Sequence, residues 1–211
     1  MQKPTLYTHP FSRGANVVWM LKECGAEYDV ELIGFGRQIR SPQYLAINPM
    51  GKVPALKTGD TVLTETVAII TWLAEQFPEK RLIPAAATPE RGEYYRWLCF
   101  AIHLEYAAFE KQNGWTGDEK YRRSVGHGDF ETAFGVLRER LRGRTFILGD
   151  HFSALDLHYT GLLNYFVNVM PILAADETFA AYVARHAARP AFAETMKWAQ
   201  QAAAELNQSG E

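Results

Sequence analysis

Short apolar runs alternate with amphipathic stretches along the first third of the chain. Residues 5–7 form an apolar run and residues 28–32 alternate in polarity, so both segments predict strands. Between them three aliphatic residues recur at helical spacing, and Gly25 follows as the residue that ends the helix. Residues 43–47 predict a short helix. The predicted order is therefore strand, helix, strand, helix.

A hairpin and a longer helix complete this part of the pattern. Gly59 and Asp60 separate two strand-like runs at residues 55–57 and 61–63, which is typical of a tight turn between antiparallel strands. Residues 66–77 then place their apolar side chains on one helical face. The order βαβ, helix, ββα predicts an α/β fold, with a small mixed sheet and helices on both faces.

The pattern changes at Pro78. Residues 82–87 are rich in alanine and predict a linker across an exposed surface. Only long helical periodicities follow. The predicted helices are residues 89–114, 119–142, 153–173, 176–187 and 190–206. We therefore expect two domains, an α/β domain at residues 1–80 and an all-α domain at residues 88–211.

One helix start is specified by its own side chains. Ser153 is the predicted N-cap, and Asp156 follows three residues later, where its carboxylate can accept the Ser153 N–H in a capping box. Phe152 and Leu157 have the spacing of a hydrophobic staple. Apolar residues surround much of this helix, which predicts a buried position where each unpaired N–H would cost about 1–3 kcal/mol.

Composition argues against several classes of function. The chain has 211 residues, of which 47% are hydrophobic and 22% charged, and its net charge is −2, which is ordinary for a globular protein. No run of five or more basic residues occurs, so we expect no nucleic-acid partner and no binding to an anionic membrane. No apolar run approaches the ~18 residues of a membrane span, and the N-terminus lacks the apolar core of a signal peptide.

Cysteine and histidine usage bears on compartment and metal chemistry. The two cysteines, Cys24 and Cys99, form no CxxC motif. They predict a reduced, cytoplasmic setting without a structural disulfide or zinc site, and we expect both to be small buried hydrophobes. The six histidines form no HxxxH pair, so we expect no metal ion.

The stretch NPMGKVPAL, residues 48–56, places a proline in an unusual position. Pro54 stands at the mouth of a predicted strand, although proline has no N–H to give to a sheet and is normally excluded from central strands. A cis bond between Val53 and Pro54 would leave the Val53 N–H and C=O available to a partner outside the sheet. The alternative is that Pro54 only fixes a turn.

Five stretches, in the same order along the chain, carry a resemblance to a known family. They are LYTHPFSRG, NPMGKVPAL, LTETVAIITWLAEQFP, FILGDHFSALDLHY and ARPAFAETM. With them the chain resembles the soluble glutathione S-transferases of a bacterial-like kind over nearly its whole length. The resemblance implies a thioredoxin-like first domain, a helical second domain, a homodimer and glutathione as the co-substrate.

The resemblance also assigns contacts to glutathione. Val53, next to Pro54, would pair its backbone with the cysteinyl backbone of the tripeptide, as in strand addition. Thr66 and the helix N-terminus suit the γ-glutamyl carboxylate, and Glu65 suits the ammonium group. The alternative at this position is a helix capped by Thr64 that binds no ligand.

A cation is expected at the glycyl carboxylate of glutathione. Lys52 is the candidate for this contact. A residue between Gln38 and Arg40 would add a second contact, and Arg40 is the candidate there, although the sequence does not fix which residue it is.

Two hydroxyl groups compete as the activator of the thiol. The pKa of a free thiol is near ~8.5, and lowering it by ~2 units requires ~2.7 kcal/mol, most of which one good donor to the sulfur anion can supply. Ser12 lies in the loop where serine-type members carry their hydroxyl, and Tyr7 ends the first strand, where tyrosine-type members carry a phenol. We favour Ser12, with Arg13 either assisting or bracing the loop. The alternatives are that Ser12 only caps a helix and that Tyr7 is a core aromatic.

The electrophile is expected in an apolar pocket between the two domains. Ile102, Tyr106 and Phe109 follow helical spacing, with Trp115 just beyond, and we expect these residues to line the pocket or, for some of them, the core. The leading function is conjugation of the glutathione thiolate to hydrophobic electrophiles. The alternatives are glutathione-dependent peroxide or disulfide reduction, and a binding module without catalysis.

Overall fold

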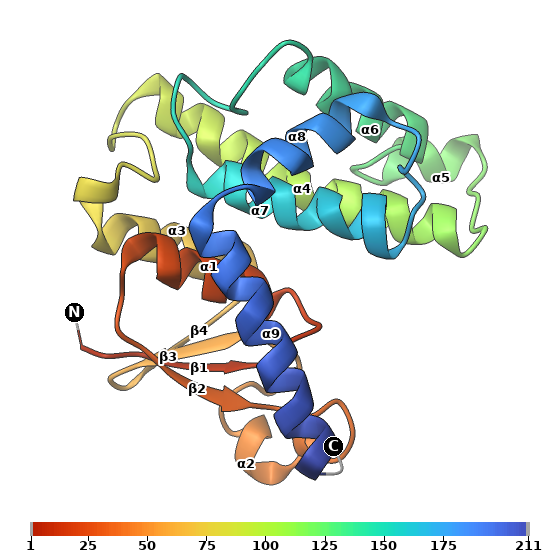
Figure 1. The fold of residues 1–211 in the computed structure, drawn as a ribbon. Coiled ribbons are helices and arrows are strands. Elements are labelled where there is room, and N and C mark those ends of the chain that lie inside the picture. Colours follow the sequence, from red (N-terminus) through yellow and green to blue (C-terminus); the bar gives the residue numbers. More distant parts are fainter. Residues whose placement is uncertain (1, 210–211) are drawn as a thin grey trace. The chain divides into compact units, whose positions relative to one another are not determined.

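The structure, a computed structural model, describes residues 2–209, and its chain divides into two compact units (Figure 1). The first unit combines the residues up to Leu82 with those from Ala188 onward, and the second is Ile83–Ala187. The last helix, which the sequence analysis assigned to the second domain, thus lies with the first unit. Residues 210–211 of that predicted domain lie outside the described residues.

The first unit is built on a four-stranded sheet in the order β2-β1-β3-β4. The strands are β1 (Thr5–Thr8), β2 (Asp29–Leu32), β3 (Ala55–Thr58) and β4 (Thr61–Thr64). β1 runs parallel to β2 and antiparallel to β3, and the hairpin predicted at Gly59 and Asp60 joins β3 to β4. The mixed α/β sheet predicted from the sequence is therefore confirmed.

Helices cover this sheet. They are α1 (Gly14–Cys24), α2 (Pro42–Leu45), α3 (Thr66–Gln76) and α9 (Pro190–Ser209), with short 3-10 turns at Gln38–Arg40 and Pro78–Lys80. α1 packs against α3 and α9, whereas Figure 1 shows α2 on the other side of the sheet. Gly25 ends α1 at φ 66°, as predicted, because only glycine adopts this left-handed conformation without steric cost.

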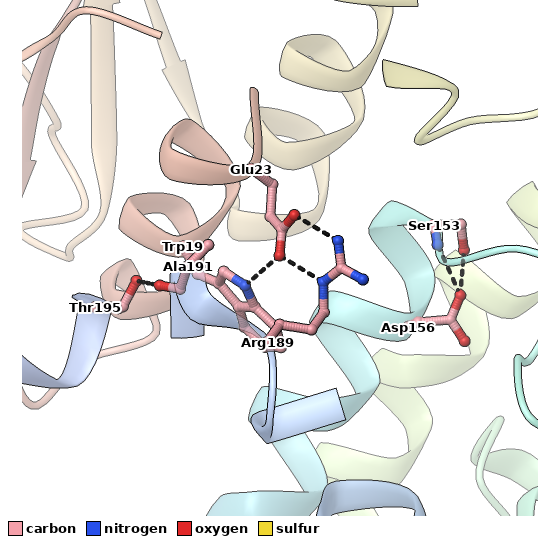
Figure 2. Close-up of polar contacts among 7 residues, drawn as sticks. All are labelled: Trp19, Glu23, Ser153, Asp156, Arg189, Ala191 and Thr195. Atoms are coloured by element: carbon pink, nitrogen blue, oxygen red, sulfur yellow. Dashed lines mark hydrogen bonds and ion pairs between the residues drawn. The ribbon is translucent and has the colours of Figure 1, made fainter. Parts of the chain in front are cut away.

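An ion pair joins α1 to the segment just before α9 (Figure 2). The guanidinium of Arg189 donates two hydrogen bonds of 2.7 Å to the two carboxylate oxygens of Glu23. Trp19 donates its indole N–H to the same carboxylate at 2.9 Å, and its ring meets Phe192 edge-on. Two-pronged geometry of this kind is the strong form of the Arg–carboxylate contact.

The second unit is helical in all its regular elements among the described residues. They are α4 (Pro89–Gln112), α5 (Glu119–Ser124), α6 (Phe130–Leu141), α7 (Ala154–Asn164), a π-helical turn (Tyr165–Val169) and α8 (Glu177–Ala187). The single helix predicted at 119–142 is divided, because Gly128 takes a φ of 65° and the Asp129 side chain caps a new helix by accepting the Thr132 N–H at 2.8 Å. The helix predicted at 153–173 loses α-geometry after Asn164.

The predicted capping box of α7 is present and is larger than the sequence indicated. One oxygen of the Asp156 carboxylate accepts the N–H and the hydroxyl of Ser153, at 2.8 and 2.7 Å (Figure 2). The other oxygen accepts the Ile147 N–H at 2.8 Å and the Tyr182 hydroxyl at 2.6 Å. Asp156 is completely buried, and these four donors replace the water that it loses.

Two features are absent from the described residues. None of the helices in residues 2–209 combines the length and apolar character that crossing a membrane requires. Within the same residues, no three His, Cys, Asp or Glu side chains are grouped as ligands for a metal ion.

Candidate active site

The turn before β3 presents an unpaired piece of backbone. The Val53–Pro54 peptide bond is cis, as predicted, and Pro54 is buried while Val53 is half-buried. Neither the N–H nor the C=O of Val53 has a hydrogen-bond partner within residues 2–209. The Val53 N–H can therefore donate one hydrogen bond to an extended peptide, and the Val53 C=O can accept one from it.

Two buried side chains hold the residue before Val53. The carbonyl of Lys52 accepts the Tyr44 hydroxyl at 2.5 Å and the Asn48 amide N–H at 2.7 Å. Tyr44 belongs to α2 and Asn48 to the turn that follows. Neither residue is among the site residues predicted from the sequence. The only available signal was the Asn-Pro pair, because asparagine often folds its side chain back on a turn.

The two predicted cations lie close to the same turn. Lys52 and Arg40 are exposed, and a side chain added at Gly51 would come within 2.9 Å of an Arg40 guanidinium nitrogen. The side chain of Gln38 is used elsewhere, because its oxygen accepts the Gly34 N–H at 2.8 Å. Of the residues from Gln38 to Arg40, Arg40 is thus the one whose charge is placed at the turn.

Within residues 2–209, no side chain caps the start of α3. Thr64, the alternative cap, belongs to β4 and does not bond the helix, and the residue at the N-cap position is Glu65. Glu65 is exposed and has φ 64° and ψ 115°, a conformation that costs a residue other than glycine roughly 1–3 kcal/mol and occurs preferentially at ligand sites. The hydroxyl of Thr66 has no partner among the described residues. Such a helix start can bind an anion.

Ser12 is held within the loop between β1 and α1. Its hydroxyl donates to the His9 carbonyl at 2.8 Å and accepts the Gly14 N–H at 3.0 Å. Arg13 is exposed at the N-cap position of α1. A side chain at Gly14 would meet the Thr8 hydroxyl at 1.8 Å, so the loop can pass this point only with glycine. The candidate hydroxyl is thereby fixed at the start of a helix.

His9 shapes the same loop and was not singled out from the sequence. Its Nδ1 atom accepts the Phe11 N–H at 3.1 Å, and its ring stacks on Phe35 at a centroid distance of 3.7 Å. Burial lowers the pKa of the imidazole below its usual 6.5, which favours the neutral ring that can accept this bond.

Tyr7 points away from the buried face of β1. Leu6 and Thr8 are buried, whereas Tyr7 is half-buried, with its ring 6.1 Å from the ring of Tyr44. Its hydroxyl has no hydrogen-bond partner in residues 2–209. The phenol therefore lies near the turn at Lys52, and the choice between Tyr7 and Ser12 stays open.

The four residues expected at the electrophile belong to the second unit. Ile102, Tyr106 and Phe109 lie on α4 and Trp115 lies just beyond it, and all four are exposed. They are thus not part of the buried core, and their role in an acceptor pocket stays a prediction.

The two cysteines have different environments. Cys24 is buried, as expected, and desolvation raises the pKa of its thiol to about 12. Cys99 is exposed, so the expectation of a buried residue was wrong. The cause is its position on α4, because the buried residues Trp97, Ala101 and Leu104 define one helical face and Cys99 lies on the other.

Residues 6–81 match the family described as glutathione S-transferase, N-terminal domain. The chain is 30% identical to glutathione S-transferase GstA of Escherichia coli O157:H7 over 179 residues, which cover 81% of this chain and 86% of GstA. The chain belongs to the glutathione S-transferase family. It is therefore a transferase enzyme with glutathione as its co-substrate, and the family and fold class inferred from the sequence are confirmed.

Further relatives agree with this membership. Glutathione S-transferase 1 of Schizosaccharomyces pombe is 26% identical, and the match covers 78% of this chain and 76% of the relative. A glutathione transferase structure from Methylococcus capsulatus superimposes with a TM-score of 0.77 at 28% identity, covering 94% of this chain and 99% of that one. A sphingomonad glutathione S-transferase in complex with glutathione gives a TM-score of 0.75 at 26% identity, with 93% and 98% covered.

Proposed function

We propose that this transferase conjugates glutathione to a hydrophobic electrophile, through attack by a bound thiolate. The proposal rests on one observation: the first unit contains both a Val53 backbone without hydrogen-bond partners among residues 2–209 and an uncapped start of α3. These two features offer the hydrogen bonds that a γ-glutamyl tripeptide requires, and residues 2–209 leave both without a partner.

Each part of glutathione then has a complementary group. Val53 pairs with the cysteinyl backbone, and Thr66 with the α3 N-terminus receives the γ-glutamyl carboxylate. Glu65 takes the ammonium group. Lys52 and Arg40, both exposed at the turn, receive the glycyl carboxylate.

We propose Ser12 as the donor to the sulfur atom. The Gly14 N–H bonded to its oxygen supports this role, because a hydroxyl that accepts one hydrogen bond becomes a stronger donor in another. The hydroxyl must turn from the His9 carbonyl to the sulfur, where one bond to an anion contributes about 1.5–3 kcal/mol. Arg13 adds positive charge near the loop. Tyr7 is the alternative donor.

The partners follow from the same reasoning. We propose that exposed apolar side chains on and after α4, namely Ile102, Tyr106, Phe109 and Trp115, contact the electrophile. We also propose a homodimer, on the strength of the family resemblance, and a cytoplasmic location, which two unpaired cysteines support.

Two measurements test this function. Calorimetric titration with glutathione should give a dissociation constant, and turnover should be found with an aryl halide electrophile. Binding without turnover on any electrophile would favour the binding module. Turnover of a hydroperoxide or a mixed disulfide, with none of an aryl halide, would favour the reductase, and absence of glutathione binding would refute the proposal.

A further inference from the structure

The Lys52 carbonyl is bonded more completely than a turn requires. A carbonyl oxygen has two lone pairs, and here both are occupied, one by the Tyr44 hydroxyl and one by the Asn48 amide. Both donors are themselves buried, with 3% and 4% of their surface exposed. Buried side chains lose their freedom to rotate, so this oxygen is fixed from two directions.

Fixing this oxygen also fixes the Val53 N–H. The Lys52 carbonyl and the Val53 N–H belong to one planar peptide group. That group is trans, because Val53–Pro54 is the one cis bond among residues 2–209, and in a trans peptide the C=O and the N–H point in opposite directions. Two bonds on the inner side therefore aim the N–H outward, where it has no partner within the described residues.

Asn48 holds the rest of the turn as well. Its side-chain oxygen accepts the Met50 N–H at 3.1 Å, and its backbone carbonyl accepts the Gly51 N–H at 2.9 Å. Tyr44 reaches the turn from α2 and remains a donor at neutral pH, because burial raises the pKa of its phenol to about 12. Hydrogen bonds to a carbonyl also polarise its peptide group and strengthen the N–H as a donor.

We propose that Tyr44 and Asn48 are positioning residues that aim the Val53 N–H at the cysteinyl backbone of glutathione. This inference rests on the proposed glutathione site and assigns to it two residues that do not touch the ligand. Because they act on an anchoring bond and not on the sulfur, they should change the affinity for glutathione and leave the chemical step nearly intact.

The test uses two substitutions that remove one donor each. Tyr44→Phe deletes only the hydroxyl, and Asn48→Asp keeps the acceptor for Met50 while placing a carboxylate oxygen against the Lys52 carbonyl. We expect the calorimetric dissociation constant for glutathione to rise about 3- to 10-fold for Tyr44→Phe and about 10-fold or more for Asn48→Asp. kcat at saturating glutathione should stay within about twofold.

Tyr28→Phe is the matched control. It removes the hydroxyl of a tyrosine that is half-buried in the first unit, and within residues 2–209 no hydrogen bond joins Tyr28 to the Lys52 turn. We expect its dissociation constant to equal that of the parent protein. Rescue of Asn48→Asp by Asn48→Gln, which restores an amide donor, would support positioning further.

The possible outcomes distinguish a failure of the positioning role from a failure of the proposed function. If the parent protein binds glutathione and both variants bind it within twofold of the parent, the positioning role is refuted and the function stands. A parallel loss of kcat, affinity and melting temperature would also refute it, because that pattern reports general damage. Failure of the parent to bind glutathione would refute the proposed function, and this inference with it.

Discussion

The start of α7 is closed by the protein's own side chains, whereas the start of α3 is left open. At α7 the buried Asp156 carboxylate receives four donors, two from Ser153 and one each from Ile147 and Tyr182. At α3 no side chain caps the helix, Glu65 takes a left-handed φ of 64°, and the Thr66 hydroxyl is unpartnered among the described residues.

The difference shows how one local rule serves two purposes. Every helix begins with N–H groups that have no partner inside the helix. Inside a core the protein must supply those partners, since each unmade bond costs about 1–3 kcal/mol. A helix start that is left open, at the price of a strained residue, instead keeps its donors for an anion. We therefore interpret the capped start of α7 as structural and the uncapped, strained start of α3 as the proposed ligand site.

The largest expected effect comes from opening the closed start. Asp156→Ala leaves buried N–H and hydroxyl groups of three residues without an acceptor, so the free energy of unfolding should fall by about 3–5 kcal/mol in urea denaturation. The glutathione KM of the protein that still folds should be nearly unchanged. Asp156→Asn, which keeps the shape of the side chain, should lower the free energy of unfolding by less. A variant with parental stability and no catalysis would contradict this structural role.

Substitutions at the start of α3 should weaken ligand binding and leave stability nearly unchanged. Thr66→Ala or Glu65→Ala should weaken glutathione binding by about 1–3 kcal/mol each, measured by calorimetry, with little change in the free energy of unfolding. Thr61→Ala, an exposed threonine on β4, is the control for loss of a hydroxyl in this unit. If both variants bind glutathione with the affinity of the parent protein, glutathione does not bind at the start of α3.

A third helix start, that of α1, sharpens the comparison because its serine is bonded on both sides. If Ser12 donates to sulfur, Ser12→Ala should raise the pKa of the bound thiol by about 1–2 units, or ~1.4–2.7 kcal/mol, with a smaller change in affinity. Tyr7→Phe should be nearly silent. The measurement is the thiolate absorbance of bound glutathione against pH.

The reverse result would identify the other hydroxyl. If Tyr7→Phe shifts the titration and Ser12→Ala does not, the phenol activates the thiol and Ser12 only braces the loop. If neither variant shifts it, the charge of Arg13 and the start of α1 carry the effect.

The smallest expected effect is a pH dependence at His9. Its pKa is lowered in the folded protein, so the unfolded chain takes up the proton first as pH falls below about 6.5. Stability is therefore fully present above that pH and is lost as pH falls toward the lowered value. The drop in unfolding free energy between about pH 7.5 and about pH 5.5 should be smaller in His9→Gln. Equal drops in the unfolding free energy of the parent protein and of His9→Gln would contradict a role of His9 in this pH dependence.

Local signals in the sequence predicted much of this molecule. The hairpin at Gly59, the helix end at Gly25 and the box of Ser153 and Asp156 depend on residues within a few positions of one another. Their φ preferences and hydrogen-bonding groups are therefore visible in the sequence. The cis bond at Val53–Pro54 was predicted in the same way, whereas the roles of Val53 and Thr66 toward glutathione rest on the family resemblance and stay predictions.

Contacts between distant residues were not visible in this way. Tyr182 reaches Asp156 across 26 positions, and Arg189 reaches Glu23 across 166. Any tyrosine or arginine on an amphipathic helix has the same local pattern. For that reason the sequence did not show that the last helix packs with the first unit, or that Tyr44 donates a hydrogen bond to Lys52.

The return of α9 to the first unit has a consequence during protein synthesis. Residues up to Leu82 leave the ribosome well before Ala188, because the whole of Ile83–Ala187 is made between them. At about 5–20 residues per second this interval lasts about 5–20 s. Throughout it the α1 surface that α9 covers is exposed, and Glu23 has no arginine to bind. The first unit therefore completes its packing only after the segment from Ala188 onward has been made, and a chain truncated before Arg189 would never do so.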